Sequence, residues 1–423
     1  MRYPLRIHST YVIFAVAAAC MNGAMEETRC SAQSLDEYVL FGASYVRVGA
    51  FGDVSSGLVG SNGLVLLEGG KIAAGVISGG DVIWDGVEIG TTQRDGTLRA
   101  AGNVYYDGFI KLYGDLRAGG SVSNLSTVTG LDVVGNVEAG GEVHFIDFFS
   151  DIVGEVHEHV DPAPTVPPVS MPIATPFTAG GPNVVGATFD ELVLNPGSYG
   201  HVVAQGAASL ALRSGEYYLE TLSADHFLDL KFDLSAGPIN VYVEDYLALR
   251  SVKDIYVNGV NINGFTPVDE ADLRQWASQI TFEVAKDVHY GGDLIGTIFA
   301  PHGTILVDTF GSITGALWAD SLDLAGATSA SMLFAPSERL QLRATSAPGD
   351  FDFDGDVDGD DYAAWADRFG AGGADYDGLA FLRWQAAYGD GIAGPRPIPE
   401  PSTALIVAAF ATVATACSRR RHV

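Results

Sequence analysis

The chain has 423 residues, of which 47% are hydrophobic and 18% are charged, and this composition argues against a disordered protein. The formal net charge of −29 argues against nucleic acid and anionic lipid as partners, because both are bound by clustered lysine and arginine. Cysteine occurs only at positions 20, 30 and 417, so no disulfide framework holds the part in between.

Residues 1–32 have the three-part pattern of a secretory signal peptide. Arg2 and Arg6 precede the apolar run 11–19, and small residues follow it. Cleavage after Ala19, Ala24 or Ala32 fits the pattern. We therefore predict that the rest of the chain is exported from the cytoplasm.

Residues 33–160 contain a repeated phrase in which one or two glycines precede a valine or another strand former. The last glycine of each copy falls at position 63, 80, 102, 120 or 141, so the period is close to 20 residues. Such a period is typical of a β-solenoid, in which each unit buries its apolar face only by stacking on the next. This region is predicted to be the first portion of a solenoid.

Residues 161–183 are rich in proline. Proline lacks the N–H donor that a central strand needs, so the segment is expected to be extended and outside any sheet. It is interpreted as a crossing that joins two portions of one solenoid, and a flexible linker between two domains is the alternative. The seven prolines are Pro162, Pro164, Pro167, Pro168, Pro172, Pro176 and Pro182.

Residues 184–346 are predicted to be the second solenoid portion. The phrase at 296–300 recurs 19 residues later at 315–319. A second pair of similar phrases, at 241–247 and 282–288, is 41 residues apart, which is interpreted as two periods. Residues 269–278 are predicted to form a short helix, inserted between strands, because Leu273, Trp276 and Ala277 follow helical spacing.

The sequence of this second portion resembles an uncharacterised family of secreted bacterial proteins. The resemblance implies a right-handed parallel β-helix and a surface location, and it implies no activity. The matching phrases are Pro196–Tyr199, Gly215–Tyr218, Gly237–Val243 and Gly296–Pro301.

An enzyme on this scaffold would need clustered acids on successive coils. Asp308, Asp320 and Asp323 flank two adjacent predicted coils, with His302 close by in sequence. The body has few lysines and no paired-aspartate motif of the hydrolase kind. We therefore predict no catalytic residue and keep a polysaccharide lyase or hydrolase as the minority alternative.

Two further patterns in the body have residue types found in binding sites. His157, Glu158, His159 and Asp161 could bind a metal, but they adjoin the proline-rich segment and lack a further ligand, which favours a plain start of that segment. An ice-binding face would need a Thr-x-Thr ladder at the coil period, and only the single copy 127–129 is present.

Residues 347–394 carry the motif with the most specific spacing. Acids occupy positions 1, 3, 5, 7, 9 and 12 of a loop, with Gly355 at position 6 and Val357 at position 8, as in an EF-hand calcium loop. Position 7 would contribute its carbonyl oxygen. The predicted Ca²⁺ ligands are Asp350, Asp352, Asp354, Asp356, Asp358 and Asp361.

Two similar helical segments follow, at 362–370 and 381–389, and the pair resembles a type I dockerin module. The resemblance implies a cohesin-like protein partner. Only Asp375 and Asp377 remain of a second loop, and Ala380 replaces its closing acid, so one calcium site is expected, and a calcium-stiffened stalk is the alternative role. The aromatic residues Tyr362, Trp365, Phe381 and Trp384 are predicted to form a small core between the helices.

Residues 395–423 resemble the PEP-CTERM sorting signal of Gram-negative bacteria. The signal combines a Pro-Glu-Pro motif, the apolar run 403–416 and a basic end. The resemblance implies that an exosortase removes the tail, so that the membrane is contacted only before processing; a plain C-terminal anchor helix is the alternative. The matching residues are Pro399, Glu400, Pro401, Arg419, Arg420 and Arg421.

The sequence thus predicts a mainly β protein. A right-handed parallel β-solenoid carries a small helical EF-hand, dockerin-like module and a C-terminal sorting helix. The predicted function is that of a secreted structural or adhesive protein of the cell surface or extracellular matrix. The alternative is a carbohydrate-binding or polysaccharide-degrading protein recruited through its dockerin, with an extracellular polysaccharide as partner.

Overall fold

The computed structural model describes residues 34–49, 52–93, 96–146, 149–224, 226–263, 267–324, 330–345, 349–351, 357–369 and 378–388. The chain divides into two compact units between Ala344 and Thr345. The first unit is the strand-rich body, and the second contains a pair of helices. The predicted signal peptide, residues 1–32, lies outside the described residues.

The first portion of the body opens with a short 3-10 turn, η1 (Leu35–Glu37), and continues as strands. Its strands are β1 (Tyr38–Val48), β2 (Gly52–Val54), β3 (Leu58–Ser61), β4 (Leu64–Ile72), β5 (Val76–Ser78), β6 (Val82–Ile89), β7 (Gly96–Ala100), β8 (Val104–Asp107), β9 (Phe109–Leu112), β10 (Gly114–Ala118), β11 (Val122–Asn124), β12 (Gly130–Val133), β13 (Val137–Ala139), β14 (Asp151–Ile152) and β15 (Val156–His157).

The second portion has longer strands and two helices. Its elements are β16 (Val184–Gly186), β17 (Glu191–Leu194), β18 (Gly197–Ala204), β19 (Ser209–Arg213), β20 (Gly215–Ala224), β21 (Leu228–Asp233), β22 (Ile239–Val257), β23 (Val260–Asn261), α2 (Glu270–Ser278), β24 (Ile280–Val284), β25 (Val288–Leu324), β26 (Ala330–Phe334) and α3 (Glu338–Thr345). The predicted helix is confirmed as α2, and Asp269 caps its first turn by accepting a hydrogen bond from the Ala271 N–H.

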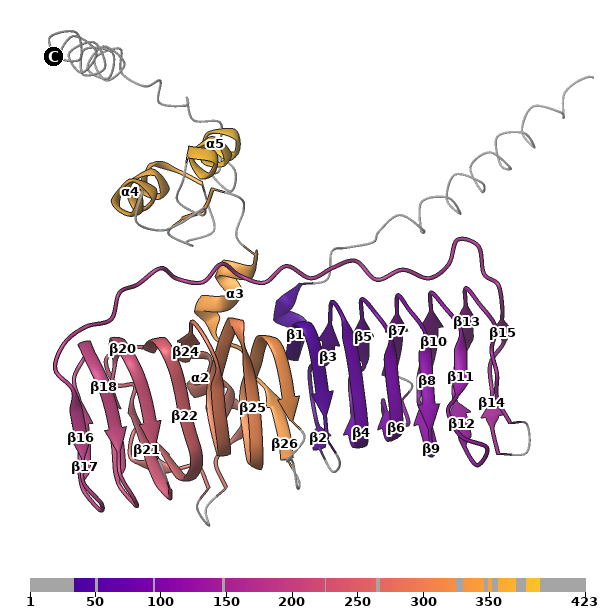
Figure 1. Cartoon of the computed structure of the whole chain (residues 1–423), viewed down its shortest axis with the longest axis horizontal. Helices are drawn as coiled ribbons and strands as arrows, with labels where there is room; N and C mark the ends of the chain where they lie inside the picture. The colour runs from indigo at the N-terminus through magenta and orange to yellow at the C-terminus, as the bar shows by residue number, and fades with distance from the viewer. Residues whose placement is uncertain are drawn as a thin grey trace, which may run out of the picture. The chain divides into compact units, whose positions relative to one another are not determined.

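The body is a parallel β-solenoid, as predicted. Strands of successive coils pair in parallel and in register, for example β4 with β6 and β7 with β10. Inward-facing residues alternate with outward-facing ones on each strand, so Leu98, Leu116 and Val137 of three successive coils are all fully buried. Figure 1 shows the coils stacked side by side along the body.

The glycine repeat is confirmed as the backbone contact between coils. The Gly80 N–H donates to Gly63 O at 3.0 Å, and the same bond recurs from Gly102 to Gly80, from Gly120 to Gly102 and from Gly141 to Gly120. The next residue of each phrase adds a side-chain ladder. Asp81 Oδ1 accepts from the Asn103 N–H, and Asn103 Oδ1 accepts from the Ser121 N–H. A Cβ at Gly120 would lie 2.3 Å from Asn103 Oδ1, so this ladder requires glycine there.

The order of the coils in space differs from their order in the chain. The first strand, β1, stacks in parallel on β25, with Leu40 opposite Leu317 and Val46 opposite Leu322, and β2 stacks on β26. Strand β1 therefore lies in the middle of the body, and β15 and β16 lie at its opposite ends (Figure 1). The two portions stack into one continuous coil. At the junction, β1 and β2 pair with β25 and β26 although the chain does not run directly from one pair to the other.

The interpretation of the 41-residue spacing as two periods is wrong. Strand β22 pairs directly with β24, with Val241 opposite Phe282, and Leu247 lies opposite Val288 of β25. The two similar phrases therefore belong to neighbouring coils. The spacing is long because β23 and α2 are inserted within one coil.

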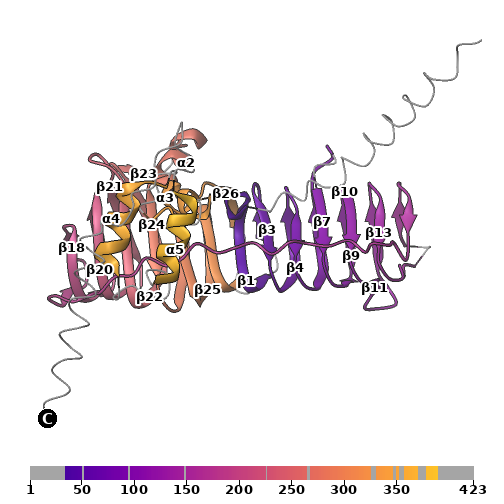
Figure 2. The same ribbon diagram turned by 90° about the horizontal axis from the view of Figure 1, so that it is seen from above.

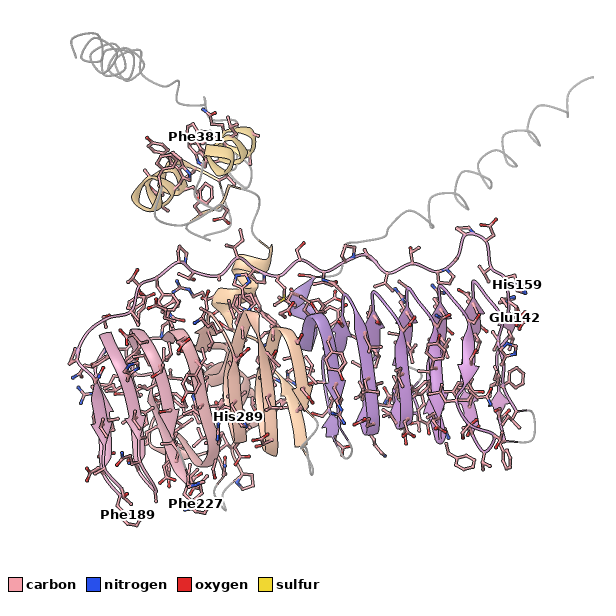
Figure 3. The ribbon with its side chains drawn as sticks, in the orientation of Figure 1. Glu142, His159, Phe189, Phe227, His289 and Phe381 are labelled. Atoms are coloured by element: carbon pink, nitrogen blue, oxygen red, sulfur yellow. The ribbon has the colours of Figure 1, made fainter. Side chains whose placement is uncertain are left out.

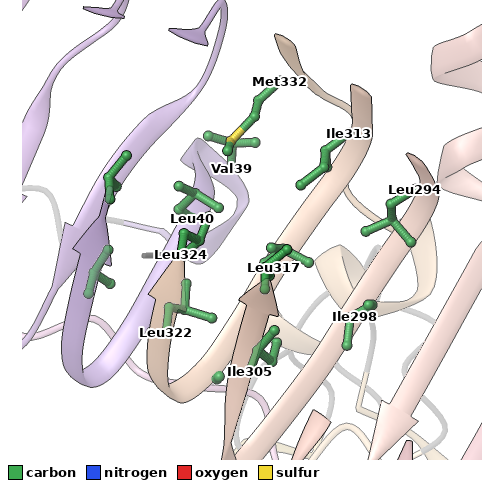
Figure 4. Packing of buried hydrophobic residues seen from close by; sticks show 14 of the residues in the cluster. Val39, Leu40, Leu294, Ile298, Ile305, Ile313, Leu317, Leu322, Leu324 and Met332 are labelled. Atoms are coloured by element: carbon green, nitrogen blue, oxygen red, sulfur yellow. The ribbon is translucent and has the colours of Figure 1, made fainter. Parts of the chain in front are cut away.

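The interior is filled with apolar side chains along its length. Valine, leucine and isoleucine from successive coils form one buried cluster that runs through the junction, where Leu40, Leu317 and Leu322 meet (Figure 4). Such stacked apolar columns supply the burial that no single coil could supply alone.

The proline-rich segment is a strap that runs along the outside of the coil from β15 to β16, as both views show (Figures 1 and 2). We call residues 161–183 the strap. The Asn62 side chain holds it by donating to Val169 O at 2.8 Å and accepting from the Val169 N–H at 2.7 Å. Farther along, the buried carboxylate of Glu283 accepts hydrogen bonds from the N–H and hydroxyl of Thr175.

A second apolar cluster lies between the strap and the outer face of the coil. Val169 of the strap packs there with Tyr38, Phe41 and Trp318, which come from both sides of the junction between β1 and β25. The strap therefore covers the place where the coil has no covalent continuity.

Replacing Asn62 with alanine is expected to loosen the strap, because two hydrogen bonds worth about 0.5–1.5 kcal/mol each are lost. Limited proteolysis should then cleave the strap of Asn62→Ala severalfold faster than that of the parent. Asn263→Ala is the control, since the Asn263 side chain bonds to Lys253 O and Asp293 instead of the strap. Equal cleavage rates for parent and Asn62→Ala would contradict the clamp.

Candidate functional site

The second compact unit contains the helices α4 (Gly359–Arg368) and α5 (Gly378–Ala387). The predicted aromatic core between them is confirmed. The Trp365 and Phe381 ring centroids are 4.7 Å apart, and those of Tyr362 and Trp384 are 5.4 Å apart. Trp384 is 4% exposed, and its indole N–H donates to Asp358 O at 2.7 Å, so the second helix is tied to the end of the acidic loop.

Three of the six predicted calcium ligands lie in the described residues, namely Asp350, Asp358 and Asp361. Asp361 is fully buried and Asp350 is 3% exposed. The Asp361 carboxylate accepts hydrogen bonds from the Phe351 N–H and, at 2.7 Å, from the Asp358 N–H. It thereby holds the first and last parts of the loop together, and Asp358 in turn caps α4.

The donor chemistry of these residues fits Ca²⁺. Carboxylate oxygens are the ligands that a hard divalent cation prefers. Burying a carboxylate is costly unless hydrogen bonds or a cation compensate its charge. Each oxygen has two lone pairs, so Asp361 can accept backbone hydrogen bonds and still face a cation. These three acids do not by themselves form a group that could hold a metal ion. Together with Asp352, Asp354 and Asp356, which lie outside the described residues, Asp350 and Asp361 would be ligands, and Asp358 would contribute directly or through water.

Several predicted residues lie outside the part of the chain that the structure describes. They are Asp352, Asp354 and Asp356 of the calcium loop, Asp375 and Asp377 of the second loop, and the sorting residues Pro399, Glu400, Pro401, Arg419, Arg420 and Arg421. Within the described ranges, no helix has the length and apolar character needed to cross a bilayer.

The three acids of the body that flank the predicted coils each have a different polar partner. Asp308 is hydrogen-bonded to His289, which Figure 3 shows on the lower part of the body. Asp320 accepts from the Ser44 hydroxyl at 2.7 Å, and Asp323 lies 3.9 Å from the Arg47 guanidinium. Each of these contacts joins neighbouring coils.

Two of the candidate metal-binding side chains at the start of the strap contact separate partners. His157 pairs with Glu155 at 3.1 Å, and Glu158 accepts a hydrogen bond from the Val143 N–H at 2.7 Å. Figure 3 shows His159 at the end of the body. Among the described residues, no group of three or more histidine, cysteine or acidic side chains is arranged to hold a metal ion.

A surface pocket of about 820 Å³ lies over β19, β21 and β22, and Asp229 lines it beside Lys231 and Tyr256. Asp229 stands opposite Asp254 of the next coil. Burial and then the charge of Asp254 raise the pKa of Asp229. Burial also raises the pKa of Asp254, but hydrogen bonds from Lys253 and Asn261 outweigh it and leave that pKa lowered.

Replacing Asp229 with asparagine is expected to stabilise the body slightly at pH 7, by about 0.5 kcal/mol or less. Because the pKa of Asp229 is higher in the folded state than in the unfolded chain, the folded state binds the extra proton between the two pKa values. Stability therefore falls as the pH rises through that interval. Thermal unfolding between pH 3.5 and 7 should show that stability falls less with rising pH in Asp229→Asn than in the parent. Asp151→Asn is the control, because Asp151 is exposed. A variant with an unchanged slope would contradict this.

A second and larger pocket, of about 1210 Å³, was not predicted. It lies between the strap and the outer side chains of four neighbouring coils at the β15 end. Arg99, Arg117, Glu138 and His157 form one column on its floor, since each lies opposite the next in the strand register. The sequence held a signal for it, because the phrases at 98–102 and 116–120 both carry arginine at the same position.

Comparisons with known proteins match part of the chain. A family model described as a domain of unknown function (DUF7305) matches residues 197–341, which is less than half of the chain. No curated protein matches the chain. Among solved structures, an ice binding protein from an Antarctic bacterium, Flavobacteriaceae, is 11% identical over 71% of this chain and 96% of its own, with a TM-score of 0.20. A score this low carries no argument about function. Thr129 is fully buried, whereas Thr127 is exposed, so the pair does not form an outward ladder.

Proposed function

We propose that the protein is a secreted structural or adhesive component of the cell surface or extracellular matrix. The observation that supports this most is the continuous coil, in which β1 and β2 pair in parallel with β25 and β26 across the junction, with one register shift between Gly42 and Tyr45. A coil with a filled apolar interior and an external strap is a rigid support for a long, repetitive surface. The net charge of −29 suits a hydrated, acidic exterior.

The helical unit would connect this surface to other molecules. Its paired helices, its aromatic core and the buried Asp350 and Asp361 support a dockerin-like module that binds Ca²⁺ through Asp350, Asp352, Asp354, Asp356, Asp358 and Asp361. A cohesin-like protein would be its partner. An exosortase would process the tail at Pro399, Glu400 and Pro401.

Cell fractionation tests this proposal. The full chain is expected in the surface or matrix fraction, and a chain with Pro399, Glu400 and Pro401 all replaced by alanine is expected to lose surface retention. Alanine at Ser402 is the control, because it lies beside the motif and outside it. A parent protein recovered in the cytoplasm would contradict the proposal.

The second candidate function is polysaccharide binding or degradation, which is favoured by the large pocket beneath the strap. If the body were a polysaccharide-degrading enzyme, Asp308→Ala, Asp320→Ala or Asp323→Ala should abolish the shortening of a polysaccharide. The structural proposal instead expects that no polysaccharide is shortened by the parent protein.

A further inference from the structure

The pocket beneath the strap at the β15 end places two arginines side by side in a strongly acidic protein. Arg99 of β7 and Arg117 of β10 are register neighbours on parallel strands, which run about 4.8 Å apart. Like charges directly opposite each other destabilise a sheet unless an opposite charge compensates them. Both side chains line the pocket.

The acids that line the same pocket leave Arg99 uncompensated. Glu138 pairs with Arg117 at 3.3 Å, and Glu158 is held by the Val143 N–H. Asp161, the remaining acid of the lining, belongs to the exposed strap. In the described part of the chain, Arg99 forms no ion pair. Its guanidinium is therefore available to an anion that enters the pocket.

The strap forms the roof of the pocket and crosses the coils closely at one side. A Cβ at Gly119 would lie 2.7 Å from Pro164 O, and a Cβ at Gly140 would lie 2.7 Å from the Ala163 Cβ. Glycine at these places lets the strap lie on the coils, and the hollow opens beside this contact. Its volume of about 1210 Å³ exceeds that of a single small anion and suits a ligand of several rings.

We propose that this pocket binds an acidic oligosaccharide, with the carboxylate of a uronic acid held between Arg99 and Arg117. A guanidinium fork matches the two oxygens of a carboxylate. Arg99 would supply this fork, and Arg117, whose Nε pairs with Glu138, would face the group from the adjacent coil. Phe145, Pro162 and Pro164 provide apolar surface for the carbon face of the sugar rings.

An acidic peptide fits the pocket less well. A peptide strand is usually recognised through main-chain hydrogen bonds to a free sheet edge. Here the floor strands β7, β10 and β13 already pair with one another, so the pocket offers mainly side chains. This proposal gives the ligand class for polysaccharide binding, the second candidate function, and it rests on the proposed surface location for its biological setting.

Calorimetric titration of the full chain with a linear tri-galacturonate tests the proposal. Binding is expected for the parent and is expected to weaken at least tenfold for Arg99→Gln, because a charged hydrogen-bonding group is lost. Arg99→Lys keeps the charge but not the fork and should fall in between. Arg250→Gln is the matched control, since Arg250 is an exposed arginine that does not line the pocket.

Three results would overturn the proposal: no binding of tri-galacturonate, equal binding by the parent and Arg99→Gln, or binding of tri-glutamate at least as tight as that of the sugar. A neutral glucose trisaccharide should not bind. Circular dichroism of each variant confirms that the fold is retained. Because the titration uses purified protein, it can fail while surface retention holds, and it can succeed while retention fails.

Discussion

Trp318→Ala is expected to lower the free energy of unfolding of the body by about 3–5 kcal/mol, the usual cost of truncating a buried tryptophan. Trp318 is fully buried in β25 and lies opposite Phe41 of β1. Its indole N–H also donates to Tyr38 O at 2.8 Å. The side chain therefore joins both sides of the junction that closes the coil, and Val169 of the strap belongs to the same cluster.

Denaturant unfolding of three proteins measures this effect. Trp318→Phe should lose less than Trp318→Ala, because it keeps a large ring and gives up only the indole hydrogen bond and some volume. Phe189→Ala is the control, since Phe189 is 81% exposed and should change stability by less than about 0.5 kcal/mol. A loss below about 1 kcal/mol for Trp318→Ala would contradict the role given to the junction.

Asp361→Asn is expected to weaken Ca²⁺ binding by the full chain at least tenfold. Asparagine keeps the size of the side chain and one acceptor oxygen, but it removes the negative charge and the second acceptor. For the parent, calcium at about 100 times its dissociation constant should stabilise the helical unit by about 2.7 kcal/mol. Chelation should remove this stabilisation.

Calorimetric titration after treatment with a chelator measures the binding. Asp360→Asn is the matched control, because Asp360 is an exposed neighbour with the same charge and lies outside the predicted ligand set. Asp354→Ala should weaken binding as Asp361→Asn does. The absence of calcium-dependent heat in the parent, or a titration of Asp361→Asn that matches the parent, would contradict the calcium proposal.

The sequence predicted the solenoid because its coil contacts are local and periodic. The glycines at 63, 80, 102, 120 and 141 are one coil apart, and each is bonded to the next. The helix α2 and the pair α4 and α5 followed from apolar spacing and repetition in the same way. The sequence spacing no longer counts coils where a coil carries an insertion. For this reason the 41-residue spacing suggested that Val241 and Phe282 are two coils apart, whereas they lie on neighbouring coils.

The arrangement of the coils could not be predicted from spacing. The pairing of Leu40 with Leu317 joins residues far apart in the sequence, and such a contact leaves no periodic trace. The pocket beneath the strap was missed for a similar reason, since its roof and floor come from segments of different kinds. The calcium loop stays a prediction, which could be made because all its proposed ligands lie within twelve residues.

The proposed scaffold depends on the closure of the coil between β1 and β25, and a cysteine pair at that junction tests it most directly. Tyr45 and Ser321 face each other in the register, at a strand separation that a disulfide can bridge. The double variant Tyr45→Cys, Ser321→Cys is expected to form a disulfide within one chain under mild oxidation, identified by mass spectrometry of its peptides. Free thiols at both positions, or a bond only between chains, would contradict the continuous coil.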